Sequence, residues 1–249
     1  PSSTPSSEFA PILFAPPVAT LTAPLSGEHY LFSIEQRSGD DIKSAGVFAY
    51  DPLAQTLYEL LPAGFRLEDV DPSGQRLLVS QDNQLYLSDL DGNLQPLTTD
   101  LAETSQSASA YWLPDGVRFL TLTGSGEDRS LVLNDTGSSS SQTIASGPIS
   151  AIQKPTSNEI FTWYQGECES DASCADRSIW QNRGGNNQAF ANGAQTSFAF
   201  DNSVYAWIEM TDGETLILYT RHADQTQQDY IYLSGNRSPE LSWSPTDLR

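Results

Sequence analysis

The stretch from Asp71 to Thr98 reads DPSGQRLLVSQDNQLYLSDLDGNLQPLT and alternates turns with short strands. The DPSG and DLDG segments are typical of tight turns, because Pro presets the backbone, Asp binds local N–H groups and Gly tolerates a positive φ. The runs QRLLVS and NQLYLSDL show the period-two alternation of β-strands. The stretch therefore predicts consecutive antiparallel strands joined by tight turns.

Related turns recur along the whole chain, at PLSG (24–27), LPDG (113–116), KPTS (154–157), FDNS (200–203) and SPTD (244–247). Their starts lie roughly 41 to 48 residues apart, the period of four-stranded propeller blades. We therefore predict an all-β protein, a β-propeller of four-stranded antiparallel blades with five complete blades and the start of a sixth. The complete blades are expected to begin near Val18, Arg66, Ser107, Pro148 and Gln195, and the sixth in SPELSWSPTDLR (238–249).

The quoted stretch, AYWLPDGVRFLTL (110–122) and LSWSPTDLR (241–249) resemble the TolB-like or WD40-like (PD40-type) β-propeller repeat. That repeat has a W-S-P-D-G-like turn, an apolar strand, and an I-Y-V-x-D-x-D-G-like strand and turn ending in L-T. KPTSNEIFTW and FDNSVYAWIE depart from it because the Gly is missing. The resemblance implies a propeller that acts as a periplasmic binding scaffold, as the noncatalytic domain of a prolyl-oligopeptidase-like hydrolase, or occasionally as a carbohydrate-active lyase.

The two ends of the chain differ from the repeats. Residues 1–17 are rich in Pro and Ser and are expected to be a linker, with FAPILFA (9–15) as a candidate closing strand. Residues 18–249 are expected to form the propeller, incomplete at its C-terminus because the sixth blade has only a strand and a turn. An unfinished blade exposes sheet edges, so we expect the remainder in the same or another chain. The alternative is a five-bladed wheel whose terminal segments pack against an edge.

Composition limits the partners. The chain has 32 Asp and Glu against 12 Lys and Arg, a formal net charge of -20. Such an acidic surface repels nucleic acid and anionic lipid headgroups. We find no apolar run approaching the roughly 18 to 20 residues of a membrane span, so we predict no nucleic-acid binding and no transmembrane segment.

The two cysteines, Cys168 and Cys174, lie in GECESDASCADRS, a polar segment that is typical of a loop. Their spacing differs from the C-x-x-C of zinc and redox sites. We predict a disulfide, worth about 2 kcal/mol by loop entropy, with two free thiols as the alternative. A disulfide would place the protein outside the cytosol, in the periplasm, secreted or anchored at the surface.

The segment from Gly166 to Arg177 is longer than a normal hairpin connection. Long loops on a rigid scaffold often carry function, so we predict that this loop binds a protein partner. The candidate residues are Glu167, Glu169, Asp171, Asp176 and Arg177.

Catalytic motifs are missing from the sequence. There is no G-x-S-x-G elbow, no H-E-x-x-H pair and no phosphate-binding G-x-x-x-x-G-K-[ST] loop. His29 and His222 are expected at exposed strand ends, DLDG (89–92) as a turn without calcium, and the tryptophans between blades. We predict no catalytic residue, metal or cofactor.

Two functions follow. The first is a noncatalytic extracytoplasmic binding or scaffold propeller that mediates protein–protein interaction. The alternative is an enzyme that acts on carbohydrate or peptide through carboxylates lining the central channel, or the noncatalytic propeller of a larger hydrolase. Carboxylates with shifted pKa values around one channel mouth would favour the enzyme.

Overall fold

The computed structural model describes the backbone of residues 18–20, 29–38, 41–102, 108–138, 140–166, 177–192, 195–198, 204–211, 215–222 and 228–234. The predicted linker and closing strand and the predicted start of a sixth blade lie outside these residues. The described strands form five four-stranded sheets, which we call blades 1 to 5 in chain order.

Blade 1 contains β1 (Val18–Thr20), β2 (Tyr30–Ser38), β3 (Asp41–Asp51) and β4 (Thr56–Leu61), and blade 2 contains β5 (Arg66–Val70), β6 (Arg76–Gln81), β7 (Gln84–Asp89) and β8 (Leu94–Asp100). Blade 3 contains β9 (Ala110–Trp112), β10 (Arg118–Thr123), β11 (Arg129–Asp135) and β12 (Ser140–Gly147), with a short 3-10 turn at Gly126–Asp128. Blade 4 contains β13 (Ile149–Ile152), β14 (Ile160–Gln165), β15 (Ser178–Arg183) and β16 (Asn186–Asn192), and blade 5 contains β17 (Gln195–Phe198), β18 (Val204–Thr211), β19 (Thr215–His222) and β20 (Gln228–Ser234).

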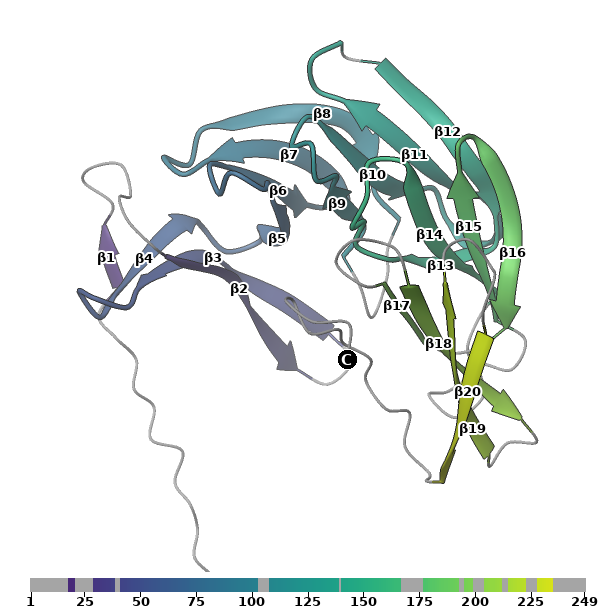
Figure 1. Ribbon diagram of the computed structural model, residues 1–249. Helices are drawn as coiled ribbons and strands as arrows, with labels where there is room; N and C mark the ends of the chain where they lie inside the picture. Colours follow the sequence, from purple (N-terminus) through teal and green to yellow (C-terminus); the bar gives the residue numbers. More distant parts are fainter. Residues whose placement is uncertain are drawn as a thin grey trace, which may run out of the picture.

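The five blades follow one another around an arc, with blades 1 and 5 at its two ends (Figure 1). In blades 2 to 5 the strands pair in chain order and every pair is antiparallel. The first strands β5, β9 and β13 lie on the inside of the arc, and the fourth strands β8, β12 and β16 lie at its rim (Figure 1). The β-propeller prediction is therefore confirmed, and these blades begin at or near the predicted residues.

Blade 1 departs from the expected order. β1 does begin at Val18, but it pairs with the outer strand β4, so that the order is β1-β4-β3-β2. This pair is parallel, with Val18 opposite Leu57, so the prediction of antiparallel strands is wrong for β1. The outer edge of a blade has unpaired N–H and C=O groups that a short segment can satisfy. Because β1 occupies the outer edge, β2 is the inner edge strand of the described part of blade 1.

The core lies between blades, and each middle blade buries both of its faces. In β6, Leu77 and Val79 face blade 1, whereas the intervening Leu78 faces blade 3. Successive side chains of a strand point to opposite faces, so a strand between two neighbours must be apolar on both. This explains why the centre of β6 has three consecutive buried apolar residues, Leu77, Leu78 and Val79, in place of strict alternation.

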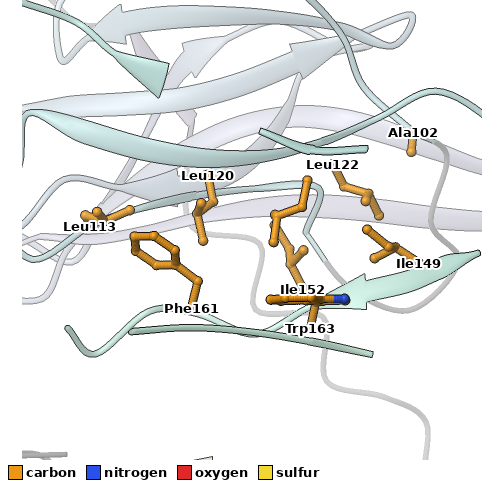
Figure 2. Close-up of a cluster of buried hydrophobic side chains, with 9 residues drawn as sticks. Ala102, Leu113, Leu120, Leu122, Ile149, Ile152, Phe161 and Trp163 are labelled. Carbon is orange, nitrogen blue, oxygen red and sulfur yellow. The ribbon is translucent and has the colours of Figure 1, made fainter. Parts of the chain in front are cut away.

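Figure 2 shows the cluster between blades 3 and 4, where Leu120 and Leu122 of β10 face Phe161 and Trp163 of β14. Trp163 also stacks on Trp180 of its own blade, with ring centroids 6.2 Å apart. Trp112 lies between blades 2 and 3, in edge-to-face contact with Phe119. The predicted packing role is confirmed for these three tryptophans, whereas the side chain of Trp207 and all of Trp243 lie outside the described part of the chain.

The turns at the outer strands share one device. The carboxylates of Asp51, Asp89 and Asp135 each accept backbone N–H groups of the following turn. In the DLDG turn, Asp89 Oδ1 accepts from Asp91 N at 3.0 Å and Asn93 N at 2.9 Å. The prediction that DLDG is a turn is therefore confirmed, and the Asp89 carboxylate serves the backbone of that turn.

Candidate functional site

The candidate site is a group of four charged side chains and one tyrosine on or just after the inner strands, which we call the inner-strand cluster: Arg66, Glu68, Asp69, Tyr111 and Lys154. Glu68 and Asp69 lie on β5, and each is only 8% exposed. Two adjacent buried carboxylates are unusual, because an ionised group out of water must be paired or hydrogen-bonded. The bonds that satisfy them show what the cluster does.

Glu68 joins blade 2 to blade 3. Its Oε2 accepts the N–H of Ser109, just before β9, at 2.7 Å. Its Oε1 accepts the hydroxyl of Ser80 at 2.6 Å and lies 3.3 Å from Nε of Arg66. Both oxygens therefore have donors, one of them from the backbone of the next blade.

Asp69 reaches two blades. Its Oδ2 accepts the N–H of Trp112 in blade 3 at 2.9 Å, and its Oδ1 accepts from Nζ of Lys154 in blade 4 at 2.6 Å. Lys154 is 85 residues away in sequence, and its side chain is 60% exposed. One carboxylate thus connects three successive blades on the inside of the arc.

Tyr111 of β9 lies next to these carboxylates. Burial raises the pKa of Tyr111, and the negative charges of Asp69 and Glu68 raise it further. Both causes disfavour the phenolate, so the hydroxyl stays protonated and can donate a hydrogen bond at neutral pH.

A second set of links runs between the inner turns. The guanidinium of Arg76, 4.8 Å above the ring of Trp112, donates to the carbonyl of Gly116 in the turn of blade 3. In the same way, Arg118 Nη2 donates to the carbonyl of Asn158 in blade 4 at 3.2 Å. Blades 2 and 3 therefore each contact the next blade through its turn as well as through the core.

The predicted partner-binding loop is described only at its ends. Glu167, Glu169, Asp171 and Asp176 lie outside the described residues, as do Cys168 and Cys174, so the disulfide stays a prediction.

Arg177 is described, and its guanidinium lies 3.9 Å above the ring of Tyr164. Burial lowers the pKa of Arg177, and the negative charge of an ionised Tyr164 would act in the opposite direction. Arg177 thus holds the base of the loop against β14.

His29 differs from its prediction. It was expected to be exposed, but its side chain is 8% exposed, and its Nε2 lies 3.9 Å from Oδ2 of Asp51. His29 follows the Gly of its turn by two residues, as Arg76 and Arg118 do in blades 2 and 3. His222 ends β19, and its side chain is not described.

Sequence reasoning missed Glu68, Asp69 and Lys154. A signal was present in LEDVDP, where two acidic residues interrupt an inner strand, but their partners come from distant blades. Within the described ranges, no group of three or more His, Cys, Asp or Glu side chains is placed to hold a metal ion. No helix in the described part of the chain is long and apolar enough to cross a membrane.

No protein-family model matches the chain, and no curated protein matches it. Solved structures do match: TolB from Acinetobacter baumannii has a TM-score of 0.55 at 11% identity, over 80% of this chain and 52% of TolB. The uncharacterized protein lmo1340 from Listeria monocytogenes has a TM-score of 0.53 at 11% identity, over 88% of this chain and 69% of lmo1340. The GH74 enzyme from Niastella koreensis has a TM-score of 0.50 at 12% identity, over 87% of this chain and 39% of the enzyme.

The chain thus spans about half of TolB and less than half of the GH74 enzyme. At identities this low, structural similarity shows the fold alone, and function has to be argued from the site. Together with the five four-stranded sheets and the repeated turns, the matches show that this chain has the β-propeller fold of TolB-like proteins.

Proposed function

We propose that the chain is a noncatalytic propeller that binds a protein partner outside the cytosol, in the periplasm or at the cell surface. The observation that carries this proposal is the use of the inner carboxylates: Glu68 and Asp69 accept backbone N–H groups from blade 3. A general acid or base must exchange protons with a substrate, which requires a free oxygen within reach. All four oxygens have donors, and those of Glu68 Oε2 and of both Asp69 oxygens come from other blades.

The proposed partner-binding element is the loop between β14 and β15, on blade 4. Its base is held by Arg177 on Tyr164, so a long acidic loop can project from a rigid strand pair. Its acidic residues Glu167, Glu169, Asp171 and Asp176 favour a partner with a basic surface. The proposed disulfide between Cys168 and Cys174 would limit the conformations of the loop and so lower the entropy lost on binding.

The test is capture of partners from native membranes by the immobilised chain, compared with a variant that lacks Glu167 to Ala175. The deletion should leave the far-UV circular dichroism spectrum unchanged and reduce capture. A matched control is Glu127→Ala with Asp128→Ala, which removes two exposed carboxylates from the equivalent loop of blade 3. Capture should survive in the control; equal capture by the deletion variant and the full chain refutes the proposed loop.

Free-thiol titration of the denatured, unreduced protein tests the disulfide separately. We expect no reactive thiol. Two reactive thiols would show that Cys168 and Cys174 are unpaired and would remove the disulfide as a reason to place the protein outside the cytosol.

The cluster around Tyr111 favours one second candidate, an enzyme that acts on carbohydrate or peptide. A protonated phenol beside two carboxylates could donate to a leaving group. Glu68→Gln and Asp69→Asn should then abolish any glycosidase or peptidase activity of the chain. Tyr111→Phe should do the same, although it leaves the blade contacts of both carboxylates in place.

A further inference from the structure

The inner-strand cluster buries its negative groups and exposes its positive ones. The side chains of Glu68 and Asp69 are 3% and 7% exposed. Those of Arg66 and Lys154 are 33% and 60% exposed. Glu68 and Asp69 are also the only acidic residues in the inner strands β5, β9 and β13, which line the inside of the arc (Figure 1). The cluster therefore presents mainly its positive groups to solvent, in a chain with a net charge of -20.

The Lys154 ammonium has more donors than its ion pair uses. An ammonium group carries three N–H donors and accepts no hydrogen bond. One of the three is directed at Oδ1 of Asp69, at 2.6 Å. The other two point elsewhere on a side chain that is mostly in solvent, so a hydrogen-bond acceptor can approach them.

Tyr111 adds a neutral donor next to both ion pairs. The charges of Asp69, Glu68 and Arg66 all act on its hydroxyl, which places the hydroxyl close to the two carboxylates and to the guanidinium. Burial and the two negative charges raise the pKa of Tyr111, so the hydroxyl keeps its proton at neutral pH. An ammonium, a guanidinium and a phenol thus meet in one place, and the carboxylates beside them are buried.

The buried carboxylates hold these donors in position. Asp69 binds the Lys154 ammonium through one oxygen, while its other oxygen is fixed by the N–H of Trp112. Glu68 is fixed in the same way by the N–H of Ser109. A ligand would therefore meet side chains that have already lost much of their freedom, which lowers the entropy cost of binding.

We propose that the Lys154 ammonium, the Tyr111 hydroxyl and the Arg66 guanidinium bind a carboxylate or phosphate group of a small molecule on the inside of the arc. Charged N–H donors form their strongest hydrogen bonds with such oxyanions. The excess of carboxylates elsewhere in the chain repels anions, which sets this group of exposed positive charges apart. The site goes beyond the proposed protein binding, which uses the loop on blade 4, and either one can fail without the other.

Nuclear magnetic resonance of the full chain tests the site directly. The chain has two lysines, Lys43 and Lys154, so selective carbon-13 labelling of lysine gives two sets of side-chain signals. Lys43→Gln leaves one set and so assigns them. Titration with sodium phosphate and, separately, with sodium acetate should move the Lys154 signals along a saturating curve. The Lys43 signals should move only as they do in sodium chloride of equal ionic strength.

Saturation with either oxyanion supports the site and shows whether it prefers phosphate or carboxylate. Shifts of the Lys154 signals that match those in sodium chloride, for both oxyanions, overturn the proposal.

Tyr111→Phe tests the neutral donor and leaves the blade contacts of Glu68 and Asp69 in place. It should weaken oxyanion binding about tenfold, as expected for the loss of a hydrogen bond to a charged group. Tyr58→Phe, on the outer strand β4 of blade 1, is the matched control and should bind like the unmodified chain. Equal affinity of Tyr111→Phe and the unmodified chain contradicts the assigned donor.

Arg66→Gln separates a local site from the effect of overall charge. It should also weaken binding about tenfold, because one of the two cations at the site is lost. Lys43→Gln removes the same charge on β3, outside the cluster, and should leave the affinity for the oxyanion unchanged. Equal weakening in the two variants would mean that only the net charge of the chain matters and would overturn the site.

Discussion

At the residue scale, Asp71 and Asp115 fix the inner turns of two blades from different positions in the turn. Asp71 begins DPSG, whereas Asp115 is the third residue of LPDG. Asp71 Oδ1 accepts the N–H of Arg76 at 3.1 Å, and Asp115 Oδ1 accepts that of Arg118 at 2.9 Å. Each carboxylate also binds Nε of that arginine. The two carboxylates therefore occupy equivalent places in the folded turns, although they come from different positions in the turn sequence.

These bonds make stability depend on pH. Burial of Asp71 acts to raise its pKa, but hydrogen bonds from Arg76, Ser73 and Gln75 outweigh this effect and hold the pKa below its usual value. A lowered folded-state pKa stabilises the fold above the unfolded value, near 4, and this contribution is lost as pH falls through the folded value.

We predict that the urea midpoint of the protein falls from pH 5 towards pH 2 and that Asp71→Asn makes the fall less steep. The two proteins should differ most near neutral pH, where the native carboxylate is ionised, and converge in acid. The exposed Asp82→Asn variant is the control and should follow the unmodified protein. Parallel curves for Asp71→Asn and the unmodified protein would contradict the assignment.

Thr162 and Gln181 form a polar pair on the face of blade 4 that points away from blade 3. They lie opposite each other, where the corresponding faces of blades 2 and 3 carry the pairs Leu78–Leu87 and Leu120–Leu133. Thr162 is 4% exposed and Gln181 is 3% exposed. Among the described residues neither Thr162 Oγ1 nor Gln181 Nε2 has a hydrogen-bond partner.

Removing a buried hydroxyl that makes no hydrogen bond to any described residue should stabilise the fold, so Thr162→Val is predicted to raise the free energy of unfolding by about 1 kcal/mol. Thr121→Val is the matched control on β10. Thr121 is also buried, but its Oγ1 accepts a hydrogen bond from Nδ2 of Asn134 at 2.9 Å. Thr121→Val should therefore lower the free energy of unfolding by about 1 kcal/mol. Denaturant unfolding measures the change in the free energy of unfolding for both variants, and changes of the same sign would contradict the argument.

At the scale of elements, β5 is a short inner strand that stabilises its neighbours through polar bonds. Asp69→Ala would leave the buried N–H of Trp112 and the ammonium of Lys154 without this acceptor. We predict a loss of about 2 to 3 kcal/mol in the free energy of unfolding, typical of hydrogen bonds to a buried charge. Glu59→Ala, at an exposed position of β4, should change it by less than about 0.5 kcal/mol. Chemical denaturation compares the two, and similar losses would refute a special role for Asp69.

The elements differ in how far the sequence could predict them. Blades 2 to 5 follow from the turn spacing, because each Pro or Asp turn marks a strand end within a few residues. The start of the three-residue β1 was predicted, but its parallel pairing with β4 could not be, since so short a strand has no periodicity and its partner is set by the sheet edge. The ties from Asp69 to Trp112 and Lys154 could not be foreseen, because they depend on how blades pack.

At the scale of the molecule, the described core consists of three clusters, one at each junction from blade 1 to blade 4. Blade 3 buries both of its faces: its Trp112 and Phe119 pack against blade 2, and its Leu120 and Leu122 pack against blade 4. An array in which each unit contacts its neighbours is stabilised by nearest-neighbour interfaces. A loss of packing contacts at one junction can therefore spread to the adjoining blades. Blades 2 and 3, which each contribute to two of these clusters, should therefore open later than blade 1.

Leu120→Ala tests this order of stability. Leu120 is 0% exposed at the junction of blades 3 and 4, so its truncation should cost about 3 kcal/mol through lost burial and a cavity. Leu53→Ala is the control, since Leu53 is 93% exposed. In hydrogen-exchange mass spectrometry, β10 and β14 should lose protection in Leu120→Ala, while β3 and β4 at the junction of blades 1 and 2 keep theirs. Equal loss in all of these strands would mean that the blades open as one cooperative unit, because only global unfolding exposes distant junctions to the same extent.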